Sequence, residues 1–212
     1  MPSKNIVKFY LPNNYYHLYT RGVNKRKIFK DQQDYEVFLQ YLKLYLTPVD
    51  ELKDIMLPGI RMNKFIRNSV AREVDLSAFA LMPNHIHLLV KQITLAGAEK
   101  LMRRVLTAYA MYFNQKYRRV GVLFQSRYKA AHVTNDEYLL YLSRYIHKNP
   151  IKIKQNDPYE FTSFPYYTRR LQASWVKPNE ILKYFVDSNK ALSYRGFVED
   201  SDTISLGDLT LE

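Results

Sequence analysis

Two apolar segments separated by only two residues constrain the fold of this chain most strongly. Val74–Met82 reads VDLSAFALM and His85–Gln92 reads HIHLLVKQ, and both have the composition of strands. The Pro-Asn pair between them favours a turn, so the sequence predicts a β-hairpin. Two of the five histidines in the chain, His85 and His87, lie inside its otherwise apolar second strand.

Patterns on either side of this hairpin predict the rest of the main domain. Residues 14–21 and 122–133 alternate as strands. Apolar residues at helical spacing predict helices over 34–46, 95–118 and 135–148. The resulting order, β-α-β-β-α-β followed by a helix, is the ferredoxin-like (RRM-like) α+β pattern. In that pattern a four-stranded antiparallel sheet carries its helices on one face.

The residue composition of the chain changes after Lys152. The following residues are rich in turn formers and basic side chains, a short helix is predicted over 179–185, and an acidic tail begins at Glu199. We therefore predict a main domain over 1–152 and a C-terminal extension over 153–212. A mixed, basic stretch over 50–72, with a turn signal at Pro58-Gly59, has the character of an insertion between the first helix and the second strand.

Composition narrows the classes of function. Lys and Arg number 32 against 20 Asp and Glu, a formal net charge of +12, and 19 of the 212 residues are tyrosine. Such an excess of basic residues indicates a polyanionic partner, and aromatic side chains among them could stack on unpaired bases. The alternative is a solvated basic surface on a tyrosine-rich core. The absence of cysteine excludes disulfides and thiolate metal sites, and without an export signal or a long apolar stretch we expect a cytoplasmic protein, nucleoid-associated in a prokaryote.

Successive side chains of a strand point to opposite faces, so His85 and His87 share one face and could bind one divalent ion. The alternative is a half-exposed strand whose histidines bind nothing. A closed structural zinc site normally has four protein ligands, which two imidazoles without cysteine do not provide. An open site, completed by a side-chain oxygen, water and substrate phosphate, would suit a catalytic ion.

Tyr145 and Asn149 are four residues apart in a predicted helix and therefore share one of its faces. One could offer a phenol nucleophile and the other an amide oxygen to a metal. Tyr138 and Tyr141 roughly continue this stripe. A stripe of aromatic residues facing the core is the alternative interpretation.

Three motifs in the same order, MPNHIHLLV, LFQSRYKAAHV and YLLYLSRYIHKNP, closely resemble those of single-tyrosine HUH transposases. The resemblance extends from about residue 15 to 169 and is greatest to the REP-associated tyrosine transposases. It implies a HUH domain with a four- to five-stranded antiparallel sheet, helices on its faces and the histidine strand in its centre. It also implies that His85, His87 and Asn149 bind Mg²⁺ or Mn²⁺ and that Tyr145 is the nucleophile.

The resemblance further implies a metal-dependent transposase or endonuclease. Such an enzyme cleaves and rejoins single-stranded DNA at hairpin-containing sites through a 5′-phosphotyrosine intermediate. Arg127 and Lys129 are expected to share a strand face and hold the DNA backbone. The other basic residues expected to contact DNA are Arg21, Lys25, Arg26, Lys27, Arg103, Arg104 and Arg144. In the extension, Tyr166, Tyr167, Arg169 and Arg170 are further candidates for holding the hairpin.

Three other interpretations stay open at this point. A domesticated hairpin nuclease would share the chemistry without moving its own gene. A non-enzymatic binder of single-stranded nucleic acid would present aromatic residues on the first and third strands. A structural metal-binding protein lacks a fourth ligand. The sequence is compatible with either a homodimer or a monomer.

Overall fold

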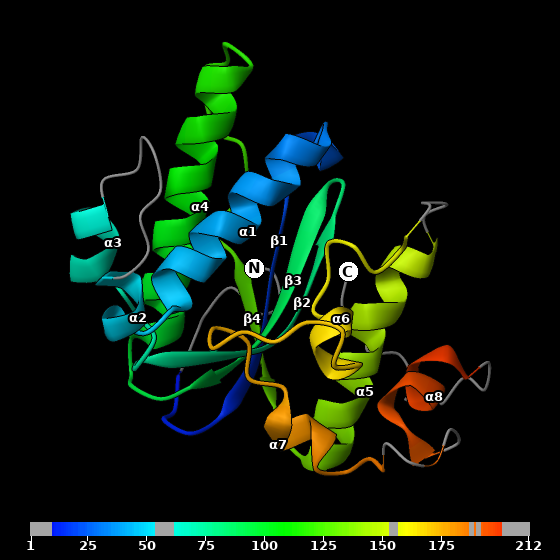
Figure 1. Ribbon diagram of the computed structural model, residues 1–212. Coiled ribbons are helices and arrows are strands. Elements are labelled where there is room, and N and C mark those ends of the chain that lie inside the picture. The colour runs from blue at the N-terminus through cyan, green and yellow to red at the C-terminus, as the bar shows by residue number, and fades with distance from the viewer. Residues whose placement is uncertain (1–9, 54–61, 153–156, 187–188, 190–191, 201–212) are drawn as a thin grey trace.

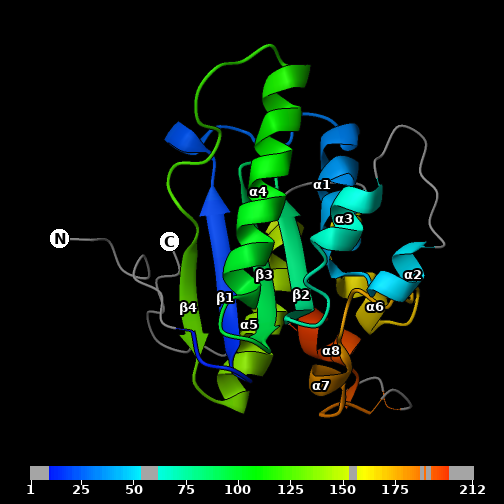
Figure 2. The same cartoon turned by 90° about the vertical axis from the view of Figure 1, so that its left-hand side faces the viewer.

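The computed structural model describes residues 10–53, 62–152, 157–186, 189 and 192–200. Four strands form one antiparallel sheet: β1 (Tyr15–Arg21), β2 (Val74–Met82), β3 (His85–Gln92) and β4 (Lys129–Val133). Their order is β2-β3-β1-β4, which places the histidine strand in the interior of the sheet (Figure 2). The predicted hairpin and the central position of β3 are confirmed.

Helices cover both faces of the sheet (Figures 1 and 2). On one face, α1 (Gln32–Leu46) and α4 (Gly97–Lys116) pack in a core that includes Leu18 and Leu88. On the other, α5 (Asp136–Lys148) packs on Ala80 and Leu89. The bare ferredoxin-like pattern placed all helices on one face, and that expectation is wrong for α5. This helix follows the last strand, so it can cross to the face that the two connecting helices leave open.

Side-chain caps fix where the main helices begin. The Asp31 carboxylate accepts a hydrogen bond from the Asp34 backbone N–H at the start of α1, and the Asn135 side chain accepts one from Tyr138 at the start of α5. These bonds satisfy backbone donors that have no partner inside the helix. Asp31 is thus the N-cap of α1.

The fourth strand is shorter than predicted. It begins at Lys129, while Phe124 makes only an isolated bridge to Gly22. Residues 125–127, which include the Gln-Ser interruption, are exposed bends outside the sheet. Arg127 therefore does not belong to the strand, and the expectation that it shares a strand face with Lys129 is wrong.

The insertion contributes two short helices, α2 (Val49–Lys53) and α3 (Met62–Arg67). The predicted turn at Pro58-Gly59 lies outside the described residues. The predicted main domain ends in η2 (Asn149–Lys152), and in the extension the structure places α6 (Phe164–Tyr167), α7 (Asn179–Leu182) and α8 (Tyr194–Glu199). The last three join α5 in one buried cluster on the same face of the sheet. The helix predicted over 179–185 ends at Leu182, and most of the acidic tail, from 201 on, lies outside the described residues.

Within the described ranges, no helix combines the length and the apolar character that crossing a bilayer requires.

Candidate active site

The candidate site is built on the face of the sheet that α5 covers. Directly paired residues of neighbouring strands lie on the same face, and β1 pairs Tyr19 with His87 and Arg21 with His85. The rings of His85 and His87 are 4.9 Å apart between centroids and nearly perpendicular. Both predicted histidine ligands therefore lie on one face, as the strand period requires.

The β2–β3 turn fixes the orientation of His85. Its Nδ1 lies 2.6 Å from the side-chain oxygen of Asn84. An amide oxygen can only accept a hydrogen bond, so Nδ1 carries the proton in this contact. The lone pair is then on Nε2, which is the nitrogen that could act as a metal ligand.

A third histidine, His17 of β1, supports His87. Its Nε2 lies 2.8 Å from His87 Nδ1, and the two rings stack with centroids 5.0 Å apart. The Nε2 atom of His87 is buried and has no hydrogen-bonding partner among the described residues. If His87 binds a metal through Nε2, its Nδ1–H must donate to His17, so His17 fixes the tautomer that binding needs.

Burial keeps these imidazoles neutral. It lowers the pKa of His17 to about 3 and holds the pKa of His87 well below its ordinary value. For His87, the neighbouring His17 and His85 and the positive charge of Arg21 act in the same direction. A neutral ring offers its lone pair to a metal without first losing a proton.

Of the predicted helix residues, Tyr145 contacts this face. Tyr145 is half-buried on α5, and its ring centroid is 5.6 Å from that of His87, edge to face. Asn149 lies one turn further on, where its backbone N–H donates to the Tyr145 carbonyl. Its side chain is buried, and its amide Nδ2 has no partner in the described part of the chain.

These residues are chemically suited to a divalent ion. The described residues contain no group of three or more His, Cys, Asp or Glu placed to hold a metal. Two imidazoles would thus need donors of another kind, which the Asn149 amide, water and phosphate oxygens can supply. The unpartnered Nε2 of His87 is a polar atom whose burial would otherwise only cost stability. For Asn149 the ligand atom would be the amide oxygen and not the unpartnered Nδ2, which is a donor.

Two of the predicted DNA-binding cations share the face of the histidines. Arg21 is paired with His85 across β1 and β3, and Lys129 with Tyr19 across β1 and β4. The Lys129 ammonium lies 5.8 Å from the centre of the Tyr19 ring. Both cations lie on the β1 side of the histidine strand, so a phosphate placed near the histidines would have two cations on that side.

Other predicted contacts lie elsewhere. Arg103 and Arg127 line a cavity of about 540 Å³ beside α4, together with Tyr10 and Glu99. The Arg104 guanidinium donates to the Asn68 carbonyl at 2.6 Å. Exposed side chains at Lys25 and Lys27 and a half-buried one at Arg26 follow β1.

Two predicted contact residues are buried within the protein. Arg144 is only 6% exposed, donates to the Asp200 carbonyl and lies over the Phe197 ring, so it does not lie on a surface that DNA could reach here. Tyr167 is also buried and donates to the Ser77 carbonyl at 2.9 Å. Of the extension candidates, Arg169 and Arg170 are exposed and Tyr166 is half-buried.

The part of the chain that matches a known family includes the residues of this site. Residues 59–149 match the family described as "Transposase IS200 like", and the matched region contains His85, His87, Tyr145 and Asn149. This part of the chain is therefore similar to the IS200-like transposases. The predicted family resemblance is therefore confirmed, and it supports a DNA-processing function of the transposase type.

Solved structures agree with the fold. One described as "Structure of the REP associates tyrosine transposase bound to a REP hairpin" aligns with a TM-score of 0.50 and 12% identity, covering 90% of this chain and 97% of that one. At that identity the likeness concerns the fold, which matches the predicted HUH architecture. A bacterial tRNA(His) guanylyltransferase (Thg1)-like protein in complex with ATP aligns at 13% identity over 73% of this chain and 69% of that one. Its TM-score of 0.36 is too low to indicate a common fold. No curated protein sequence matches the chain significantly.

Proposed function

We propose that this IS200-like transposase domain cleaves and rejoins single-stranded DNA at hairpin-bearing sites, with Tyr145 as the nucleophile. The observation that carries the proposal is the approach of the Tyr145 ring to His87, whose buried Nε2 has no partner in the described part of the chain. A tyrosine beside a preoriented histidine pair, of which His87 is held neutral by burial, suits a metal-assisted phosphoryl transfer.

In the proposed step, the Tyr145 oxygen attacks a backbone phosphorus and the bond from phosphorus to the 3′ oxygen breaks. The phenol loses its proton and the 3′ oxygen gains one, which leaves a free 3′-hydroxyl and a 5′-phosphotyrosine link. Attack by a 3′-hydroxyl on that link reverses the step and rejoins DNA, so no other energy source is needed.

His85, His87 and Asn149 would hold Mg²⁺ or Mn²⁺. When bound, such an ion polarises the phosphate and offsets the negative charge that develops on its oxygens. Arg21 and Lys129, which share the face of the histidines, would orient the phosphate for in-line attack.

The packing of α5 supports an active site within one copy of the chain. Tyr145 and His87 approach each other inside a single chain, because α5 packs on its own sheet. The proposed reaction therefore requires no second copy to supply the tyrosine. A protein that acts on chromosomal hairpins in this way would work in the cytoplasm.

The covering of the sheet argues against a non-enzymatic binder of the RRM type. Such a binder stacks bases on an open sheet face. Here α5 lies over the face that carries Tyr19 and His87, and α1 and α4 lie over the other (Figure 1). Mobility of the gene itself distinguishes a transposase from a domesticated nuclease, and both use the site proposed here.

Covalent adduct formation tests the proposal. Hairpin-bearing single-stranded DNA incubated with the protein and Mn²⁺ is expected to give a denaturation-resistant adduct that EDTA abolishes. The variant His87→Ala should lose the adduct, while His132→Ala, which alters an exposed histidine of β4, should retain it. An adduct that forms equally well in His85→Ala/His87→Ala would refute the metal site.

A further inference from the structure

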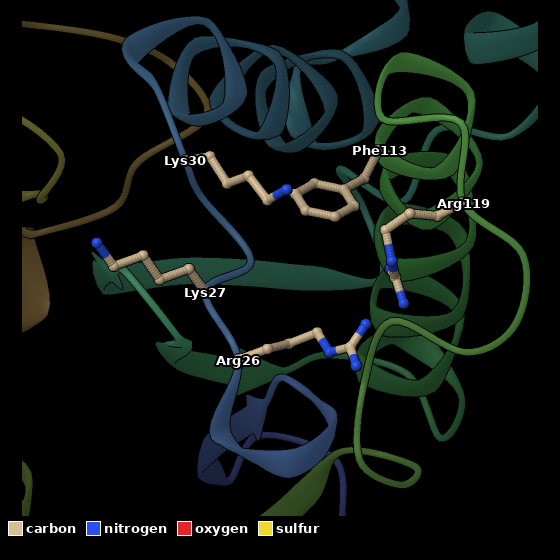
Figure 3. A pocket seen from close by; sticks show the side chains of 5 residues that line it. All are labelled: Arg26, Lys27, Lys30, Phe113 and Arg119. Atoms are coloured by element: carbon tan, nitrogen blue, oxygen red, sulfur yellow. The ribbon is translucent and has the colours of Figure 1, made fainter.

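A second basic site lies on the other side of the sheet from α5. A cavity of about 480 Å³ is lined by Arg26, Lys27, Lys30, Phe113 and Arg119, where the segment between β1 and α1 meets the end of α4 (Figure 3). Its lining therefore combines four cations, one aromatic ring and no carboxylate. We propose that this cavity, hereafter the basic pocket, binds backbone phosphates of the DNA substrate away from the reacting phosphodiester.

The cations of the basic pocket face one another. In Figure 3 the guanidinium groups of Arg26 and Arg119 point toward each other across the cavity, and Lys30 reaches over Phe113, while Lys27 extends away at the rim. Within the described ranges, none of these four side chains forms an ion pair with a carboxylate. Like charges around one cavity repel, so a bound anion would stabilise the arrangement.

The adjacent acids, Asp31 and Asp34, are engaged by other groups, although the single ammonium of Lys116 offsets only one of their two charges. Asp31 and the fully buried Asp34 accept hydrogen bonds from Lys116 at 2.7 and 2.9 Å and from Tyr117 at 3.0 and 2.8 Å. These carboxylates hold α1 against α4 and do not line the basic pocket. The positive charge of the pocket is therefore left to an external partner.

The protein holds two of these cations in place before any ligand binds. The Lys30 ammonium lies 4.1 Å from the centre of the Tyr117 ring, and the Arg119 guanidinium lies 5.8 Å from that of Phe113. Cation–π contacts of this kind restrict long side chains. Arg119 also donates to the Asn114 side chain at 3.1 Å, just after Arg118 reverses the chain in a left-handed conformation (φ 47°).

The chemistry of the lining identifies the ligand as a phosphodiester. Guanidinium groups match phosphate oxygens with paired donors. The cavity lies within the range of about 300 to 1,000 Å³ typical of small-molecule sites, which suits a nucleotide unit. Phe113 is fully buried and offers no surface for a base, so the pocket would hold the backbone independently of sequence.

Hydrogen bonds connect the basic pocket to the candidate active site. The backbone N–H groups of Ile28 and Phe29 donate to the Pro83 carbonyl, and the Asn84 side chain donates to the Lys25 carbonyl. Pro83 and Asn84 form the turn that begins the histidine strand. One DNA strand could therefore contact both sites at this end of the sheet, and the inference rests on the proposed function for its choice of ligand.

Salt-dependent binding tests the basic pocket. Arg26→Gln/Arg119→Gln is compared with Lys43→Gln/Arg67→Gln, which removes the same charge from exposed positions outside the pocket. The pocket variant should bind labelled hairpin DNA about tenfold more weakly at 0.1 M salt, with a salt slope smaller by about two, for DNA of any sequence. The control should bind within about twofold of the wild type, and matching thermal melts would show that both variants fold.

The outcomes separate the two proposals. If the adduct forms but the pocket variant binds like the control, the basic pocket is wrong and the proposed function stands. If no adduct forms but the pocket variant alone binds weakly, the pocket stands and the proposed catalysis is wrong. If the wild-type protein does not bind the DNA, both are wrong.

Discussion

The hydrogen bond between His17 Nε2 and His87 Nδ1 decides which nitrogen of His87 is available to a metal. Without His17, the His87 ring would lose the contact that fixes its tautomer and its orientation in the buried site. We therefore assign His17 a positioning role, because its Nε2 is the partner of His87 Nδ1.

Replacing His17 should weaken metal binding directly. We expect His17→Ala to reduce Mn²⁺ affinity about 10- to 100-fold, the effect typical of losing a residue that orients a ligand. Electron paramagnetic resonance of free Mn²⁺ measures this without DNA or turnover. His132→Ala serves as the control, and an unchanged affinity in His17→Ala would exclude the positioning role.

The residue pattern predicted the site only in part. The strand period placed His85 and His87 together, and the helical period placed Tyr145 and Asn149 together. The strand period of two also places His17 on the same face of β1 as Tyr19 and Arg21. Only the pairing of β1 with β3 brings His17 to His87. Sequence spacing cannot reveal that partner, because it arises between segments about seventy residues apart.

Among the elements, α5 decides the geometry of the site because it carries Tyr145. His147 of the same helix is fully buried, with Nδ1 2.6 Å from the Tyr194 hydroxyl and Nε2 2.6 Å from the Ser163 hydroxyl. The Ser163 oxygen also accepts from the Phe79 backbone N–H on β2. These bonds attach α5 to the sheet and to α8.

The burial of His147 predicts acid sensitivity. Burial lowers its pKa to about 3, so the folded protein keeps it neutral while the unfolded chain takes up a proton below about pH 6.5. The free energy of unfolding therefore decreases as the pH falls from 6.5 toward 3. At pH 5, the contribution of His147 to this decrease is about 2 kcal/mol.

Urea unfolding at several pH values tests this effect. His147→Gln should be less stable than the wild type at pH 7. Between pH 6 and 4, its free energy of unfolding should change with pH less steeply than that of the wild type, by about 1.4 kcal/mol per pH unit. His132→Gln, which changes an exposed ring, should leave the dependence unaltered. An equal slope in His147→Gln and the wild type would contradict the neutral state.

At the level of elements, the strand and helix patterns predicted most boundaries to within a few residues. They failed where tertiary contacts decide the outcome. Residues 122–128 alternate like a strand, yet only Phe124 finds a bridge to Gly22 before β4 begins. The side of the sheet that α5 takes was also unpredictable, since its amphipathic pattern would fit either face.

Across the whole molecule, the extension packs as part of the same core. Tyr194 and Val198 of α8 are fully buried against α5, and Trp175 stacks on Phe79 of β2 with ring centroids 5.6 Å apart. The change in composition after Lys152 predicted that an extension begins there. Composition does not show which elements the extension packs on. The boundary itself stays a prediction.

This packing predicts that the main domain and the extension unfold together. The fluorescence of Trp175, which is the only tryptophan and lies in the extension, should change in the same urea transition as the far-ultraviolet circular dichroism. Tyr194→Ala should destabilise that single transition by about 3 to 5 kcal/mol. Two separate transitions would show that the extension folds on its own.

The proposed reaction depends on a covalent bond between Tyr145 and DNA. Proteolysis of the adduct formed with hairpin DNA and Mn²⁺, followed by mass spectrometry, identifies the modified tyrosine among the three that share the stripe on α5. We predict that the nucleotide is attached to Tyr145, that Tyr145→Phe forms no adduct, and that Tyr141→Phe still forms it. A nucleotide on Tyr138 or Tyr141, or an adduct that survives in Tyr145→Phe, would show that Tyr145 is not the nucleophile.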